Sequence, residues 1–152
     1  MTAREKWRRL GESDLAGTVS QKEIDVYRRS EPVDGSDPVA ALLERTGRMI
    51  RGYMRSVPQI RTDPHDEASI PEGLVNAACD YAAFDVLKRQ PLPISEDRRA
   101  ARRDAIALFA KIAERKFIPS SWAGEDAGAT PAAARQAIKS RRRVRADGLN
   151  GY

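Results

Sequence analysis

The chain has 152 residues, enough for one hydrophobic core and too few for two domains of ordinary size. It carries 27 Lys and Arg against 22 Asp and Glu, a formal net charge of +5, and its 32% of charged residues favours a soluble helical protein. The single cysteine, Cys79, excludes an intrachain disulfide framework and a cysteine-based zinc site. The N-terminus lacks an apolar signal region and no 18 apolar residues run together, which argues against secretion and against a membrane partner.

Composition divides the chain into three parts. Residues 1–19 are polar apart from one conspicuous apolar anchor, Trp7, and we expect them to form an extended or irregular N-terminal arm. Residues 20–122 contain the periodic apolar residues, and we expect them to form the helical bundle domain. Residues 123–152 hold six basic and three acidic residues but few bulky aliphatic ones, so we expect a basic C-terminal arm that becomes ordered only against a partner.

Two capped helices are predicted in the first half of the bundle. Ser20 and Glu23 have the spacing of a capping box and open a helix over about residues 21–29. A second helix is predicted over about residues 38–56, because Asp37 is a good N-cap and a proline follows it. Its expected buried face consists of Val39, Leu42, Leu43, Thr46, Ile50, Tyr53, Met54 and Val57. Its expected exposed face consists of Glu44, Arg45, Arg48, Arg51 and Arg55.

A third predicted helix, about residues 72–89, follows a loop rich in proline and short polar residues. Apolar residues cover most of its circumference, so we expect it to be the central helix, contacted from several sides. Ser95 is the predicted N-cap of a fourth helix. The face of that helix that we expect to be exposed to solvent carries Arg98, Arg99, Arg102, Arg103 and Lys111. The predicted fold class is all-α, a small helical bundle of about four helices with extended N- and C-terminal arms.

The sequence offers no pattern typical of catalysis, of a cofactor or of a metal site. His65 is the single histidine, so a solvated loop is favoured over a metal site. Asp80 and Asp85 interrupt the apolar surface of the third predicted helix. For both, an exposed position along the helix or an interhelical salt bridge is favoured over acid–base catalysis. Cys79 is expected to pack as a small hydrophobe. Because the sequence has no Walker loop, nucleophile elbow or HExxH motif, we expect no enzyme.

A basic run, KSRRRVR, occupies residues 139–145. Each Lys or Arg that neutralises a phosphate releases counterions, so phosphate binding is physically reasonable. The run has no interleaved aromatic residues for base stacking. Three interpretations of the run therefore stay open: docking on an acidic protein surface, nucleic-acid binding, and a solvated tail. Trp7 and Trp122 are possible contact residues, and Trp122 is alternatively a plug that closes the bundle.

Four segments follow one another along the chain: VSQKEIDVYRRS, VAALLERTGRMIRGYM, IPEGLVNAACDYAAFDVLKR and RRDAIALFAKIAERKFIPSSW. In their order and their use of small residues they resemble the head-to-tail connector, or adaptor, proteins of tailed phages and related prophages. The resemblance covers residues 18–122, about two thirds of the chain. It rests on helix order, since these segments contain no catalytic motif.

The resemblance implies a helical bundle that forms a twelvefold ring below the portal, in the neck of a virion assembled in the host cytoplasm. The implied partners are the portal protein, neighbouring copies of the chain, a tail or stopper protein, and DNA that passes through the channel without sequence readout. The implied portal-docking arm lies in residues 124–152, with Arg135, Ile138, Lys139, Arg141, Arg142, Arg143 and Arg145 as candidate contacts. The alternative is a nucleic-acid-binding helical protein, such as a small packaging or regulatory factor.

Overall fold

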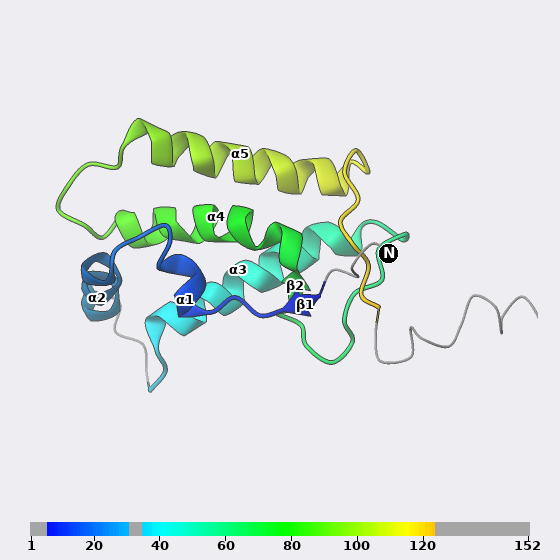
Figure 1. Ribbon diagram of the computed structural model, residues 1–152, viewed down its shortest axis with the longest axis horizontal. Coiled ribbons are helices and arrows are strands. Elements are labelled where there is room, and N and C mark those ends of the chain that lie inside the picture. Colours follow the sequence, from blue (N-terminus) through cyan, green and yellow to red (C-terminus); the bar gives the residue numbers. More distant parts are fainter. Residues whose placement is uncertain (1–5, 31–34, 124–152) are drawn as a thin grey trace, which may run out of the picture. The chain divides into compact units, whose positions relative to one another are not determined.

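The structure is a computed structural model that describes residues 6–30 and 35–123 (Figure 1). Two compact units are distinguished, Met1–Trp122 and Ala123–Tyr152, and all contacts reported lie within the first. Its elements are β1 (Trp7–Arg8), α1 (Glu12–Leu15), α2 (Gln21–Ser30), α3 (Pro38–Arg55), β2 (Ile70–Pro71), the 3-10 helix η1 (Glu72–Leu74), α4 (Val75–Leu87) and α5 (Glu96–Ala113). The prediction of an all-α fold, a small helical bundle, is confirmed.

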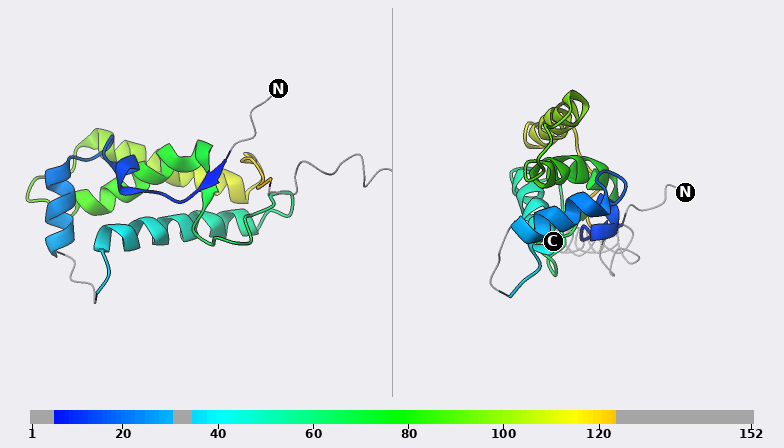
Figure 2. Two further views of the ribbon diagram at one scale, coloured as in Figure 1. Left: turned by 60° about the horizontal axis from the view of Figure 1, so that its bottom comes forward. Right: turned by 90° about the vertical axis from the view of Figure 1, so that its left-hand side faces the viewer.

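Helix α4 lies at the centre of the bundle and contacts α1, α2, α3 and α5. In Figure 1 and Figure 2 it runs between α5 and α3. Three alanines on α4, Ala78, Ala82 and Ala83, have no exposed surface. Such small side chains let neighbouring helices approach closely, and the larger Phe109 and Ile112 of α5 fill the remaining space without reaching solvent. The prediction that this segment forms the central helix is confirmed.

The predicted N-terminal caps of three helices are present. The Ser20 backbone N–H donates to Glu23 Oε2 (2.7 Å), and the Glu23 N–H donates in return to Ser20 Oγ (3.4 Å). Asp37 Oδ1 accepts from the Val39 N–H at 3.3 Å. Ser95 Oγ accepts from the Arg98 N–H at 3.4 Å. These bonds satisfy backbone donors that have no partner inside the helix, which explains why α2, α3 and α5 begin where the sequence predicts.

We expected an extended or irregular arm over residues 1–19, but residues 6–19 pack as part of the bundle. Strand β1 pairs antiparallel with β2, with Trp7 opposite Pro71 and Arg8 opposite Ile70. Leu10, Leu15 and Val19 are buried in the core, and α1 contacts α4. The three aliphatic residues are spaced too irregularly to show the period of a helix or a strand. Their burial could therefore not be predicted from the periodicity of the sequence.

Two arginines that we expected to face solvent are largely buried. Arg51 of α3 is only 3% exposed, because the loop before β2 folds over its side of the helix. Arg102 of α5 lies over the rings of Tyr81 (4.7 Å) and Phe84 (4.3 Å) of α4. A planar guanidinium can stack on aromatic faces while keeping its charge. The expectation that every charged side chain faces solvent does not allow for such contacts.

Candidate partner interface

One end of the bundle, which we call the loop end, is built from three parts of the chain. They are residues 56–69 between α3 and β2, strand β1, and residues 114–122, which follow α5 (Figure 1 and Figure 2). The two tryptophans that the sequence marked as possible contact residues, Trp7 and Trp122, both lie in these segments. Far-separated parts of the sequence therefore meet at this end.

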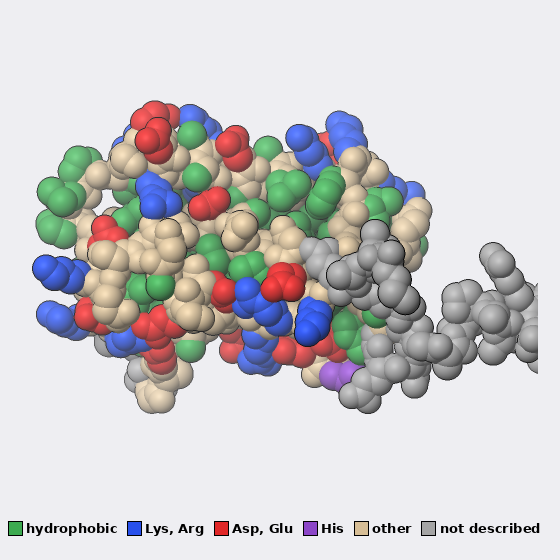
Figure 3. All heavy atoms as spheres, viewed as in Figure 1, with side chains coloured by type: hydrophobic (Ala, Val, Ile, Leu, Met, Phe, Trp, Pro, Cys, Tyr) green, Lys and Arg blue, Asp and Glu red, His purple; other side chains and the backbone are tan. Residues whose placement is uncertain are grey.

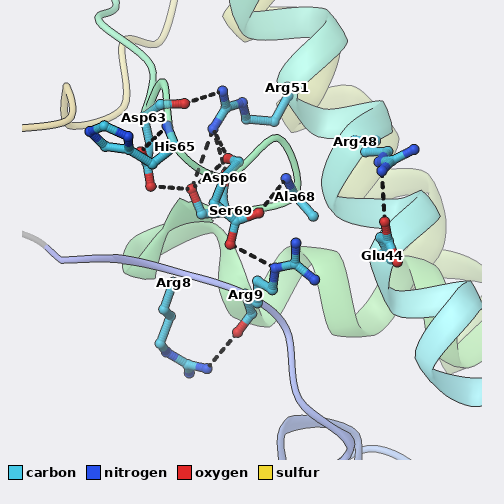
Figure 4. A network of polar contacts seen from close by, with 10 residues as sticks. All are labelled: Arg8, Arg9, Glu44, Arg48, Arg51, Asp63, His65, Asp66, Ala68 and Ser69. Atoms are coloured by element: carbon cyan, nitrogen blue, oxygen red, sulfur yellow. Dashed lines mark hydrogen bonds and ion pairs between the residues drawn. The ribbon is translucent and has the colours of Figure 1, made fainter.

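Arg51 organises the loop end by binding backbone carbonyl groups (Figure 4). Its Nη1 donates to the carbonyl oxygens of Asp66 (2.7 Å) and Ser69 (3.2 Å), and its Nη2 donates to that of Asp63 (2.6 Å). The guanidinium thus satisfies three carbonyls of a loop that has little secondary structure of its own. This geometry holds residues 63–69 against α3.

Burial and nearby charges act on Arg51 in opposite directions. Burial lowers the pKa of Arg51 below its ordinary value, while the nearby carboxylates of Asp63 and Asp66 act in the opposite direction. The Trp7 ring lies 5.4 Å from the guanidinium carbon and adds a favourable cation–π contact. The same arginine therefore links α3, the loop and β1.

Two acidic residues of the loop, Asp63 and Asp66, act as hydrogen-bond acceptors. Asp66 Oδ2 accepts from Arg9 Nε at 2.7 Å, and this bond lowers the pKa of Asp66. Asp63 Oδ1 accepts from the backbone N–H of His65, and Asp63 Oδ2 from the hydroxyl of Ser69. His65 is exposed. Within residues 6–30 and 35–123, no cluster of His, Cys, Asp or Glu side chains could hold a metal ion.

Trp7 joins the N-terminal strand to the segment after α5. Its indole Nε1 donates to the carbonyl oxygen of Ser120 at 3.0 Å, across 113 positions of the sequence. The ring is partly buried against the core. The bond places the first strand of the bundle beside the residues from which the basic C-terminal arm continues.

Trp122 is fixed by the loop after α3. Its backbone N–H donates to the carbonyl oxygen of Arg61 at 2.7 Å, and the Arg61 N–H donates to Ser121 Oγ at 3.1 Å. The Trp122 ring lies 5.4 Å from the Arg61 guanidinium carbon and 5.9 Å from the His65 ring. The backbone of Trp122 is therefore held at a defined place on the loop end.

Large apolar side chains reach the surface at both ends of α5. Phe117 (41% exposed) and Ile118 (53% exposed) belong to the loop end, and Leu92 (76% exposed) lies in the turn between α4 and α5. Figure 3 shows hydrophobic side chains gathered over that turn. Exposed apolar residues in such positions mark candidate contact surfaces, although scattered single ones are ordinary.

The other predicted sites have mixed outcomes. Asp85 lies 3.6 Å from Arg102 of α5, so of the two alternatives expected for it, an exposed position or an interhelical salt bridge, the salt bridge is present. Cys79 is buried as expected, and this burial, with Asp14 and Asp80 adding to it, raises the pKa of its thiol to about 12. The docking residues Arg135, Ile138, Lys139, Arg141, Arg142, Arg143 and Arg145 lie outside the described residues. Their role stays a prediction.

Sequence reasoning missed the role of Arg51, although a signal for it exists. Arg51 follows Gly47 by four positions and precedes Met54 by three, so all three lie on one face of α3, and the other two are buried. A charged residue on an apolar face indicates a buried partner. The partners here are backbone carbonyls, which leave no mark in the sequence.

The loop end contains two hydrogen-bonded tryptophans and a buried arginine. No family model, curated protein or solved structure matches this chain. The described residues form no helix with the length and apolar character needed to cross a membrane.

Proposed function

We propose that the chain is a head-to-tail connector subunit of a tailed phage or prophage. In this role it is a structural protein of the virion neck, assembled in the host cytoplasm, without catalytic residues or a cofactor. It docks on the portal ring, contacts neighbouring copies in a twelvefold ring, and meets a tail or stopper protein on its other side. DNA passes through the channel without sequence readout.

The observation that carries the proposal is the agreement between the four resembling segments and the elements of the bundle. VSQKEIDVYRRS contains α2, and VAALLERTGRMIRGYM lies within α3. IPEGLVNAACDYAAFDVLKR contains β2, η1 and α4, and the last segment covers most of α5 and the closing residues up to Trp122. The order of the helices and the long loop before β2 agree with the resemblance, which supports the proposal.

The loop end adds a mechanical argument. A connector must transmit a pull on its arm into its body, and such a load needs a rigid attachment. Trp122, the residue before the arm, bonds to the loop that Arg51 holds against α3. Phe117 and Ile118 add exposed apolar surface next to this attachment. These features support a docking surface that continues from the loop end into the arm.

Deletion of residues 124–152 tests the role of the arm. We expect the truncated chain to keep its helical circular dichroism and to lose its binding to the portal protein in a pull-down. The matched variants replace Arg141, Arg142 and Arg143 by Glu or by Lys, and only the Glu variant should lose binding, because Lys keeps the positive charge. Undiminished binding by the truncated chain would reject the arm's role.

The basic run at residues 139–145 favours nucleic-acid binding as the second candidate function. Binding through phosphates makes the logarithm of the affinity fall linearly with the logarithm of the salt concentration. A filter-binding titration of the full chain across salt therefore separates the two functions. A steep slope supports the second candidate, and a flat response or no binding removes it.

A further inference from the structure

The turn between α4 and α5 carries the most exposed large hydrophobic side chain of the described residues. Leu92 is 76% exposed, whereas the three other exposed side chains of this kind are between 39% and 53% exposed. Pro91 and Pro93, on either side of it, are exposed as well. Residues 90–95 read QPLPIS and contain no charge, in a chain of which 32% is charged. The turn therefore presents an uncharged apolar tip, which we call the Leu92 tip (residues 91–93).

The backbone of the tip is restrained by its prolines and by hydrogen bonds at its base. Each proline fixes its own φ and limits the conformation of the residue before it, so Gln90 and Leu92 are restricted as well. The Gln90 side-chain amide donates to the carbonyl oxygens of Glu23 in α2 (2.9 Å) and Val86 in α4 (3.2 Å), and the Gln90 N–H donates to that of Leu87 (3.1 Å). A segment restrained in this way loses little conformational freedom when it binds a partner.

The Leu92 tip lies at the opposite end of the bundle from the loop end. Helix α4 ends at Leu87 and α5 begins at Glu96, so the tip joins these two helices at one of their ends. The 18 residues of α5 separate it from residues 114–122 by about 27 Å. Figure 1 shows the turn projecting beyond α2 at this end. The tip and Trp122, the residue before the arm, therefore lie at opposite ends of α5.

A restrained apolar tip suits an apolar pocket on another protein. Burial of an exposed leucine side chain contributes about tenfold or more to an affinity. Two grooves on the described part of the chain are each lined by four charged residues, which makes a second copy a poor receiver for an uncharged tip. A pocket lined by aliphatic or aromatic side chains on a different protein is the better match.

We propose that the Leu92 tip inserts into an apolar pocket of the tail-side neck protein, by which we mean the tail or stopper protein of the proposed function. The inference rests on the proposed function for one premise, that the arm docks on the portal. Because the arm continues from the loop end, that end then faces the portal and the opposite end faces the tail. The Leu92 tip is the exposed apolar feature at that opposite end. It thereby sets the direction of each subunit in the neck.

Substitution of Leu92 in the full-length chain tests the contact. Leu92→Asp would place a charge in the apolar pocket, and Leu92→Met is the matched control because it keeps an apolar side chain of similar size. Pull-down titrations use the purified tail-side neck protein and, separately, the portal protein of the phage or prophage that encodes the chain. We expect Leu92→Asp to weaken binding of the tail-side neck protein at least about tenfold and to leave portal binding unchanged. Because the side chain is exposed, both variants should keep the helical circular dichroism.

Photo-crosslinking identifies the neighbour of the tip directly. Cys79 is buried and the pKa of its thiol is raised to about 12, so a maleimide reagent labels an added surface cysteine selectively. A benzophenone maleimide attached to the Leu92→Cys chain should cross-link to the tail-side neck protein in the assembled complex. Ile118→Cys is the matched site at the loop end, where the side chain is 53% exposed, and it should cross-link to the portal protein instead.

Undiminished binding of the tail-side neck protein by the Leu92→Asp chain overturns the contact and leaves the connector function standing. A cross-link from the Leu92→Cys chain to the portal protein, to another copy of the chain or to no protein at all also overturns the contact, provided that the complex has assembled. An original chain that binds neither the portal protein nor the tail-side neck protein overturns the contact and the proposed function together.

Discussion

At Gly47 the loop end lies directly on α3, and the absence of a side chain makes this possible. A Cβ at Gly47 would lie 2.4 Å from the carbonyl oxygen of Ala68, far inside normal contact distance. Arg51 sits one turn further along the same face and binds the carbonyls of the same loop. A missing side chain and a buried guanidinium, four positions apart, thus hold the loop in place.

We expect Gly47→Ala to lower the free energy of unfolding by about 1–3 kcal/mol, because the Ala68 backbone must move to admit the methyl group. Gly52→Ala is the matched control in the same helix, since nothing lies within 4 Å of a Cβ there. It should raise the free energy of unfolding by about 0.5–1 kcal/mol, the usual gain of Ala over Gly in a helix. Urea unfolding measures both, and equal effects of the two substitutions would contradict this packing.

At the scale of elements, α5 ends in a turn that normally contains glycine. The Lys116 N–H donates to the Lys111 carbonyl (2.9 Å) and the Arg115 N–H donates to the Ile112 carbonyl (3.0 Å), the two bonds of a Schellman motif. Arg115, at the left-handed position of that motif, has φ of 61°. A side chain at such a φ is strained, since its Cβ crowds the backbone.

We expect Arg115→Gly to raise the free energy of unfolding by about 1 kcal/mol by removing this strain. Arg115→Ala keeps the Cβ and should leave the stability close to that of the original chain. Thermal unfolding followed by circular dichroism compares the two variants. A glycine variant no more stable than the alanine variant would show that the turn carries no strain.

The beginnings of α2, α3 and α5 could be predicted from the sequence because a cap is a local interaction. Ser20, Asp37 and Ser95 each bond a backbone N–H two or three positions further on, so spacing alone reveals them. The central position of α4 follows in the same way from its nearly continuous apolar surface. Local pattern and tertiary packing agree for these elements.

The loop end could not be predicted because its contacts join distant parts of the chain. Trp7 bonds to Ser120, and Arg51 binds carbonyl oxygens between 12 and 18 positions away. A carbonyl acceptor is the same in every residue, so the sequence does not indicate which loop an arginine will bind. Trp7 and Trp122 were recognised as unusual residues, and their meeting place required the fold.

At the scale of the whole bundle, two arginine–aspartate pairs join segments that are distant along the chain or belong to different helices, and a third lies within the N-terminal segment. Arg8 binds Asp14 (2.8 Å), Arg9 binds Asp66 (2.7 Å) and Arg28 binds Asp37 (2.8 Å). The hydrogen bond from the arginine is in each case the main cause that lowers the pKa of the aspartate. The pairs are partly exposed, so each contributes modestly and solvent screens it.

These lowered pKa values predict acid sensitivity. Asp in an unfolded chain has a pKa of about 3.9, so the unfolded state binds more protons on acidification. The stabilisation is present above about pH 4 and is lost as the pH falls through the lower pKa values of the folded protein. Urea unfolding between pH 7 and pH 2.5 should show this decline, and Asp66→Asn should make it shallower. A free energy of unfolding that stays constant below about pH 4 would contradict the role of the pairs.

Electron microscopy of the purified full-length chain, alone and mixed with the portal protein of the phage or prophage that encodes it, tests the central claim most directly. The account predicts closed rings of the chain seated coaxially on one face of the portal. Single copies that never associate with each other or with the portal would contradict it.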